Sequence, residues 1–324
     1  MTTLKRTARP DDFLLSVVAP VYNEEGNIRK FIERVVAAMD KAKIRFELIL
    51  VNDGSKDDSV LIILQMAKED RRIKLINFSR NFGHQMAISA GWDYANGDAV
   101  VILDSDLQDP PELIPDLVTK WQEGYDIVNA VRKTRQDTFF KKMTATLFYK
   151  LLNRILTSKI PENVGDFRLM DARPVAVMRK LKERDRYIRG LTNWIGFKQA
   201  FVEFDRDKRS AGVTNYTMGK MINLALNGVF SFSDFPRKLA HYAWILSLLL
   251  AVGIVVYAVV LHLTGINVPG WTSQVFIVVF FSSVQLFLTS IVLEYVSRVY
   301  WQLQNRPLYI VSETINLDPE VEEG

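Results

Sequence analysis

The stretch Ala99-Val-Val-Ile-Leu-Asp-Ser-Asp-Leu-Gln-Asp-Pro-Pro-Glu112 joins an unbroken apolar run to a group of carboxylates. The apolar run predicts a buried strand, and the Asp and Pro residues after it predict a turn. Carboxylates at positions i and i+2 in such a turn can converge on one hard cation, Mg²⁺ or Mn²⁺, that shares a diphosphate. A D-x-D pair arises often by chance, so the prediction for Asp104 and Asp106 depends on this apolar strand and on the Gln108-Asp-Pro-Pro that follows.

Similar apolar runs alternate with helical patterns on both sides of this stretch. The predicted strands are Leu14–Ala19, Phe46–Val51, Ile73–Phe78, Ala99–Leu103 and Asp126–Val131, and the predicted helices are Asn27–Asp40, Asp57–Glu69, His84–Tyr94 and Pro111–Glu123. Strands that alternate with helices and are rich in β-branched residues predict an α/β fold with a parallel core to its sheet.

Polar residues follow four of the predicted strands. These segments are Pro20–Glu25, Asn52–Ser55, Ser79–Gly83 and Asp104–Glu112. A helix cap would explain one of them, because Ser55 or Asp57 could cap the helix that follows. Ligands of parallel α/β sheets bind beyond the carboxyl ends of the strands, so four polar ends at one edge predict a binding site.

A second feature is a block without formal charge. Residues 239–293 contain no Asp, Glu, Lys or Arg, and the turn-rich segment Thr264–Gly270 divides them into stretches 239–263 and 271–293. Each stretch, as a helix, would be about 35 Å long and could cross a bilayer. A buried hairpin of a soluble core is the alternative, but such helices rarely lack a polar face over this length. The sequence therefore predicts a transmembrane hairpin.

The charges around this hairpin predict its orientation. Arg237 and Lys238 precede it, Arg298 and Arg306 follow it, and the connecting turn has no Lys or Arg. The positive-inside rule then places both flanks, and hence the large domain and both termini, in the cytosol. The first residues have no apolar segment typical of a cleavable signal peptide.

The composition of the chain excludes several kinds of functional site. The chain has 324 residues, no Cys and three His, which excludes a disulfide framework, a thiolate metal site and a cysteine nucleophile. The net charge is +4, and the acidic C-terminal segment leaves a larger positive excess on residues 1–238. A basic domain attached to a membrane suggests anionic headgroups or phosphate substrates; nucleic acid is a poorer fit beside the hairpin.

Four motifs together resemble glycosyltransferase family 2, with its GT-A nucleotide-sugar fold. They are Pro20-Val-Tyr-Asn-Glu-Glu25, Val51-Asn-Asp-Gly-Ser55, Asp104–Glu112 and Asn163-Val-Gly-Asp-Phe-Arg-Leu-Met170. With the hairpin, the chain resembles the polyprenyl-phosphate branch, which includes dolichol-phosphate mannose synthases. Within that branch it looks closest to bacterial undecaprenyl-phosphate glucosyltransferases, and a near neighbour transfers formyl-aminoarabinose.

The resemblance implies roles for individual residues. The implied nucleotide-sugar contacts are Pro20, Tyr22, Glu24 and Asp53, with Arg132, Arg206, Arg209 and Tyr216 toward the phosphates; the metal and diphosphate cluster is Asp104, Asp106 and Gln108; the catalytic residues are Asp166 and Arg168. Asn215 stands where the family usually has Lys, which leaves Arg206 and Arg209 to supply that charge.

The implied reaction is metal-dependent, inverting transfer of one hexose to a polyprenyl phosphate at the cytosolic face of a bacterial inner membrane, for O-antigen or other envelope modification. Glucose from UDP-glucose is the first expectation, and an aminoarabinose derivative, mannose or a guanine nucleotide stays open. A processive synthase would need more spans and a Gln-x-x-Arg-Trp motif, which is missing. A non-enzymatic nucleotide-binding regulator or a transporter subunit is the other alternative, although a transporter would have ionisable residues within its spans.

The expected domains are a GT-A domain at residues 1–217, an amphipathic interfacial segment at 218–238, the hairpin at 239–293, and a strand with an acidic tail at 294–324. Residues 138–155 are basic and aromatic and predict a second interfacial helix, with core or oligomer-interface helices as the alternative for both segments. The strand at 307–312 is expected to extend the sheet of a neighbouring subunit in a homo-oligomer.

Overall fold

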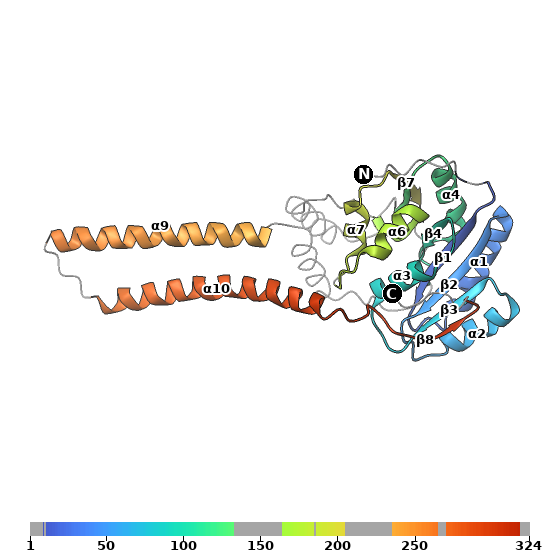
Figure 1. Ribbon diagram of the computed structural model, residues 1–324, viewed down its shortest axis with the longest axis horizontal. Helices are drawn as coiled ribbons and strands as arrows, with labels where there is room; N and C mark the ends of the chain where they lie inside the picture. Colours follow the sequence, from blue (N-terminus) through green and yellow to red (C-terminus); the bar gives the residue numbers. More distant parts are fainter. Residues whose placement is uncertain are drawn as a thin grey trace. The chain divides into compact units, whose positions relative to one another are not determined.

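The computed structural model describes residues 9, 11–132, 164–184, 186–204, 235–264 and 270–317 (Figure 1). The described residues divide into two compact units. One contains a mixed sheet with its covering helices and includes the C-terminal segment from Pro307. The other contains the long helices α9 (Phe235–Leu263) and α10 (Trp271–Leu303).

The strands of the first unit form one sheet in the order β7-β5-β6-β4-β1-β2-β3-β8. Their bounds are β1 (Leu14–Val21), β2 (Arg45–Asn52), β3 (Ile73–Phe78), β4 (Ala99–Ile102), β5 (Ile127–Arg132), β6 (Val164–Asp171), β7 (Gln199–Phe204) and β8 (Val311–Ile315). Strands β4, β1, β2 and β3 are parallel. Strand β6 runs antiparallel to both β4 and β5, and β8 runs antiparallel to β3. The predicted parallel core is confirmed, with antiparallel additions around it.

Helices cover both faces of this sheet. On one face lie α1 (Ile28–Ala42), α2 (Ser59–Glu69) and α4 (Ile114–Gln122), which follows a short 3₁₀ turn, η1 (Pro111–Leu113). On the other face lie α3 (His84–Tyr94), α6 (Ala172–Lys180) and α7 (Ile188–Trp194). The central strands are buried on both sides, which explains why they have continuous apolar runs and not alternating ones.

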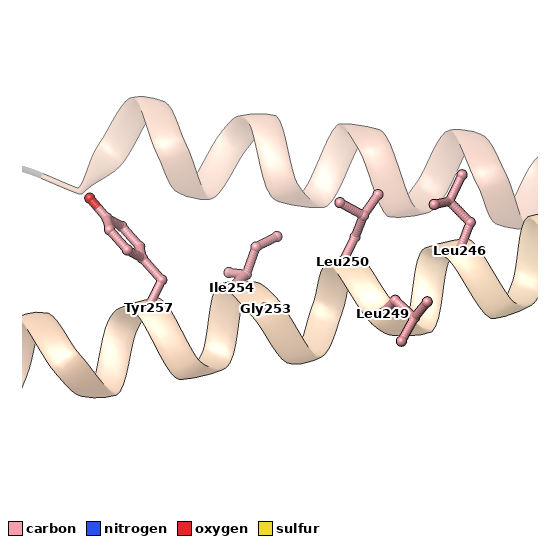
Figure 2. Close-up of a pocket in the computed structure, with 6 residues that line it drawn as sticks. All are labelled: Leu246, Leu249, Leu250, Gly253, Ile254 and Tyr257. Atoms are coloured by element: carbon pink, nitrogen blue, oxygen red, sulfur yellow. The ribbon is translucent and has the colours of Figure 1, made fainter.

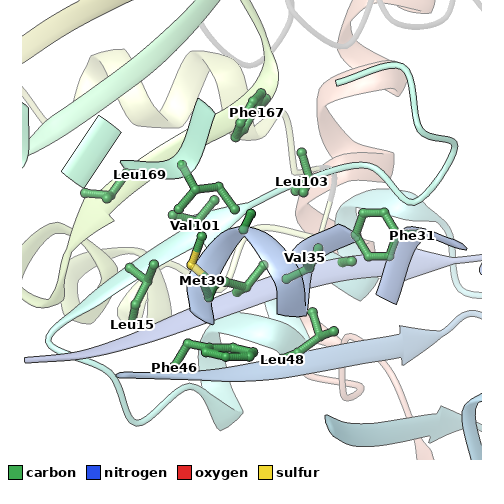
Figure 3. Packing of buried hydrophobic residues seen from close by; sticks show 14 of the residues in the cluster. Leu15, Phe31, Val35, Met39, Phe46, Leu48, Val101, Leu103, Phe167 and Leu169 are labelled. Atoms are coloured by element: carbon green, nitrogen blue, oxygen red, sulfur yellow. The ribbon is translucent and has the colours of Figure 1, made fainter. Parts of the chain in front are cut away.

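The core between α1 and the sheet shows how the helical pattern produces this packing. Phe31, Val35 and Met39 recur at four-residue spacing, so they lie on one side of α1 and reach the sheet (Figure 3). On the opposite face α3 packs very closely against β1. A Cβ at Gly91 would lie 2.0 Å from Val18 Cγ1, so only glycine allows this approach.

The C-terminal strand differs from its prediction. Strand β8 lies at Val311–Ile315 and pairs with β3 of the same chain, so the expected pairing with a neighbouring subunit is wrong for this strand. The exposed edge of β3 offers unpaired backbone groups, and the chain's own end reaches them. The Ser79 N–H donates to Ile310 O at 3.0 Å, and Ser312 Oγ donates to Asn77 O at 2.9 Å.

In the second unit, α9 and α10 lie side by side (Figure 1). Tyr242–Leu261 and Phe276–Leu303 are each long and apolar enough to cross a membrane, and neither is buried within the protein. Leu246, Leu250, Ile254 and Tyr257 recur along one side of α9 and line a shallow apolar groove (Figure 2). These exposed apolar surfaces suggest membrane association.

Both helices are longer than the predicted spans. Helix α9 begins at Phe235, within the segment 218–238 that was expected to be interfacial, and α10 continues to Leu303, past the predicted end at Leu293. The added turns of α10 contain the ion pair of Arg298 and Glu294, 2.8 Å apart. Residues 138–155 and 218–234 lie outside the described residues, so the expected interfacial helices stay predictions.

Candidate active site

Four strand ends meet at one edge of the sheet. Strands β1, β2 and β4 finish there, and β6 starts there because it runs in the opposite direction. The register places Arg168 of β6 opposite Ile102 of β4. Asp166, two residues before Arg168, therefore lies beside Asp104, two residues after Ile102. The pairing of β4 with β6 brings the two predicted aspartates together.

Asp166 is the centre of this cluster and is 5% exposed. Arg189 of α7 holds it with two hydrogen bonds, Nε to Oδ1 and Nη2 to Oδ2, both of 2.9 Å. His84 Nε2 lies 3.5 Å from Oδ2. Burial by itself raises the pKa of Asp166, but Arg189, His84 and Arg168 outweigh burial and hold this pKa well below its usual range. Asp166 is thus a carboxylate with low affinity for a proton.

Arg168 is the interior support of the cluster. It is 1% exposed, and its guanidinium donates to Thr192 Oγ1 at 2.7 Å and to Gly165 O at 2.8 Å. Burial lowers its pKa to about 10, which still leaves it charged at neutral pH. These contacts hold the start of β6 to α7. The catalytic role implied for Arg168 stays a prediction.

The Asp104–Gln108 turn lies next to Asp166. Ser105 Oγ donates to Pro20 O at 2.8 Å, which ties the turn to the end of β1. Asp104 Oδ1 is buried and has no hydrogen-bond partner, although His84 Nε2 lies 3.7 Å away. Burial raises the pKa of Asp104 to about 6. The charge of His84 opposes this rise, and the neighbouring carboxylates add to it. Asp106 Oδ1 accepts from the N–H of the buried Gln108 at 3.1 Å.

These side chains suit a divalent cation. Within the described residues no group of three His, Asp or Glu side chains is arranged to hold a metal ion by itself. The buried, unpartnered oxygen of Asp104 is nevertheless a hard oxygen ligand, and Asp106 lies two residues further on in the same turn. Asp104 and Asp106 would hold the cation, and a bound diphosphate would complete its ligands. Bound there, the cation would neutralise charge on the leaving diphosphate.

The residues expected to contact the nucleotide lie at the same edge. Pro20 is in β1, and the Tyr22 side chain beyond it is 46% exposed. The Glu24 N–H donates to Ser59 Oγ at 2.8 Å, which fixes this turn against the start of α2. On β5, the end residue Arg132 pairs with the buried Asp109 at 3.2 Å. The nucleotide and phosphate contacts implied for these residues stay predictions.

Asp53 has a structural role that the sequence did not predict. Its carboxylate accepts hydrogen bonds from the Phe82 N–H at 2.6 Å and the Gly83 N–H at 3.0 Å. Burial raises the pKa of Asp53, and these two hydrogen bonds oppose that rise. Asp53 thereby fixes the loop that leads into α3.

Sequence reasoning missed two residues of the cluster. His84 begins α3 directly after the polar segment Ser79–Gly83, so its position beyond a strand end was a usable signal. Arg189 lies on α7, outside every motif, and only the fold brings it to Asp166. The implied phosphate contacts Arg206, Arg209 and Tyr216, and the altered position Asn215, lie outside the described residues.

Comparisons with known proteins identify the family of this chain. The family model "Glycosyl transferase family 2" matches residues 16–178. An uncharacterized glycosyltransferase of Bacillus subtilis, YkcC, is 47% identical over 94% of both chains. The SfII prophage-derived bactoprenol glucosyl transferase of Shigella flexneri is 39% identical over 94% of this chain and 99% of that one.

Among solved structures, mannosyl-3-phosphoglycerate synthase from Rubrobacter xylanophilus is 15% identical, with a TM-score of 0.47 over 71% of this chain and 75% of that chain. The family match extends over half of the chain, and the relatives cover nearly all of it. This chain is a member of glycosyltransferase family 2, with a GT-A sheet followed by two long apolar helices.

Proposed function

We propose that this glycosyltransferase moves one hexose from a nucleoside diphosphate sugar to a polyprenyl phosphate, with UDP-glucose as donor and bactoprenyl phosphate, the undecaprenyl acceptor, as the first choice. The observation that carries the proposal is the cluster in which Asp104, His84, Asp166 and Arg189 meet at the carboxyl edge of the sheet. The exposed apolar helices and a relative named for bactoprenol glucosyl transfer support the lipid acceptor.

The bond changes define what the site must do. A phosphate oxygen of the acceptor attacks the anomeric carbon, the bond from that carbon to the donor's β-phosphate oxygen breaks, and the nucleoside diphosphate leaves with the electron pair. A single displacement of this kind inverts the anomeric carbon. The acceptor is a phosphate monoester with a second pKa of about 6, so near neutral pH it is mostly a dianion and needs no strong base.

The surroundings of Asp166 support an orienting role for it. A carboxylate held by the Arg189 fork, with a pKa well below its usual range, is a poor proton acceptor. Asp166 would instead hold cationic side chains toward the acceptor phosphate. An Asp166→Asn enzyme should therefore keep residual activity with a flat pH profile. Complete inactivity of this variant at pH 8 would contradict the orienting role.

The function is tested by transfer of labelled glucose from UDP-glucose into organic-extractable lipid, in membranes that contain undecaprenyl phosphate. Parallel reactions with EDTA, with other nucleotide sugars and with Asp104→Asn test the metal and the sugar. Asp116→Asn is the control, because Asp116 is exposed on α4. We expect a labelled lipid from UDP-glucose and not from the other nucleotide sugars. This product should be lost with EDTA and with Asp104→Asn and kept with Asp116→Asn. Absence of a lipid product from every nucleotide sugar would favour a non-enzymatic protein.

We also propose a membrane topology in which both termini and the unit that contains the sheet, called the catalytic unit below, lie in the cytosol. This topology has its own test. Because the chain contains no Cys, single cysteines can be introduced without removing any native thiol. Asn267→Cys lies between the two helices, and Lys56→Cys lies on an exposed position of the catalytic unit. In intact cells a membrane-impermeant maleimide should label Asn267→Cys and spare Lys56→Cys. The reverse labelling would refute the orientation.

A further inference from the structure

His84 lies between the two carboxylates that the proposed reaction depends on. Its Nε2 is 3.7 Å from Asp104 Oδ1 and 3.5 Å from Asp166 Oδ2. Asp104 follows the end of β4, Asp166 lies near the start of β6 and His84 is the first residue of α3, so three elements bring these side chains together. The His84 side chain is 42% exposed, and those of Asp104 and Asp166 are 33% and 6% exposed, so His84 lies on the solvent side of Asp166.

The backbone before His84 holds it in this place. Gly83 has φ +101°, a conformation that residues with a Cβ rarely adopt. The Phe82 and Gly83 N–H groups donate to the Asp53 carboxylate, and Asn81 Nδ2 donates to Asp53 O at 3.0 Å. A buried carboxylate and a glycine conformation thus fix where α3 begins. This loop places the imidazole beside the two aspartates.

We infer that His84 is a positioning residue that ties Asp104 to Asp166 and so sets the separation of donor diphosphate and acceptor phosphate during transfer. The inference rests on the proposed function. Asp104 would act at the leaving diphosphate and Asp166 at the acceptor, and both act on the same displacement. The two carboxylates repel each other, and an imidazole nitrogen within about 4 Å of both can offset that repulsion by carrying an N–H. A misplacement of about 1 Å between reacting groups can cost about 100-fold in rate.

A merely structural role predicts a different outcome. Arg189 holds Asp166 without His84, and the imidazole is 42% exposed. Loss of the imidazole should therefore leave the fold and nucleotide binding almost unchanged and reduce the transfer step. A structural role would lower stability, nucleotide affinity and turnover together.

The test compares three substitutions of His84 in the full-length protein. The side-chain amide nitrogen of His84→Gln can occupy the place of Nε2, that of His84→Asn is too short to reach it, and His84→Leu has no donor. We expect kcat to fall about 100-fold for Leu and Asn but less than about 10-fold for Gln. The affinity for UDP with Mn²⁺, measured by calorimetry, should change less than about threefold in all three, as a positioning role requires.

A double-mutant cycle completes the test. If His84 acts through Asp166, His84→Leu combined with Asp166→Asn should reduce kcat by much less than the product of the single losses. Multiplicative losses, equal kcat in the Gln and Asn variants, or a parallel fall in UDP affinity would overturn the inference. If the wild-type protein forms the glycolipid and all three variants turn over normally, the inference about His84 is overturned and the proposed function stands. A wild-type protein that forms no glycolipid overturns the proposed function as well.

Discussion

The ion pair of Arg189 with Asp166 offers a test of the site that needs no substrate. Arg189→Ala removes two hydrogen bonds of 2.9 Å from a carboxylate whose side chain is 6% exposed. Arg34 is a matched control, because it makes a similar fork to Glu112 with bonds of 2.9 and 2.7 Å. The two arginines are similarly exposed, at 27% and 25%, but Glu112 is 53% exposed. The two variants therefore differ mainly in the burial of the carboxylate.

The magnitude follows from that difference. Breaking a fully buried ion pair costs about 3–5 kcal/mol. The partial exposure of Arg189, together with the nearby His84 and Arg168, reduces the cost here to about 2 kcal/mol. At about 2–4 °C per kcal/mol, Arg189→Ala should lower Tm by about 4–8 °C. An exposed pair contributes about 0–1 kcal/mol, so Arg34→Ala should change Tm by no more than about 4 °C.

Thermal unfolding of both purified variants in the same detergent measures this contrast. The pKa of Asp166 should also rise in Arg189→Ala, because the strongest opposing charge is gone. Asp166→Asn in the Arg189→Ala background should then recover part of the lost stability, since the amide removes an uncompensated buried charge. Equal Tm losses in the Arg189 and Arg34 variants would refute the argument that burial of the carboxylate decides the cost.

Three further predictions concern the fold around the site and elsewhere in the first unit. Gly83→Ala, at φ +101°, should lower the free energy of unfolding by about 1–2 kcal/mol, measured by chemical denaturation. Gly26→Ala also meets open space but has no positive φ, so it should lower this free energy by less than about 1 kcal/mol, and equal losses would contradict the strain at Gly83. Burial raises the pKa of Asp93, whose Oδ2 accepts a hydrogen bond from the Tyr309 hydroxyl at 2.7 Å. The ionised Asp93 therefore destabilises the folded protein at pH values above its folded-state pKa. This cost is absent below its unfolded-state pKa of about 4, where the carboxyl is protonated in both states. Asp93→Asn should therefore raise Tm at pH 8, and the gain should disappear toward pH 4; a gain that grows on acidification would refute the sign. Deletion of Val311–Ile315 should expose the edge of β3 and cause aggregation, measured by light scattering, while an unchanged monodisperse protein would contradict that role of β8.

Local patterns in the sequence were sufficient for much of the fold. The apolar runs at Leu14–Ala19 and Phe46–Val51 predicted β1 and β2 because strands buried on both faces need continuous apolar residues. The absence of charge over residues 239–293 predicted two long apolar helices in the same way. The polar strand ends also located the edge of the sheet where Asp104 and Asp53 lie.

Other features depend on contacts between residues far apart in the chain. The insertion of β6 between β4 and β5 places Asp166 beside Asp104, and no local periodicity encodes which strands become neighbours. The pairing of β8 with β3 is equally non-local, which is why its partner was mispredicted.

The sequence by itself determined the strands, the helices, the apolar hairpin and the aspartates of the D-x-D turn, because each is a property of neighbouring residues. Only the tertiary structure decided that Arg189 forms an ion pair with Asp166 and that His84 lies near both Asp104 and Asp166. Those contacts come from α7 and α3, and their positions depend on how whole elements pack on the sheet. Burial then makes these contacts matter for Asp166, because a carboxylate in water has an ordinary pKa and stays ionised without a charged partner.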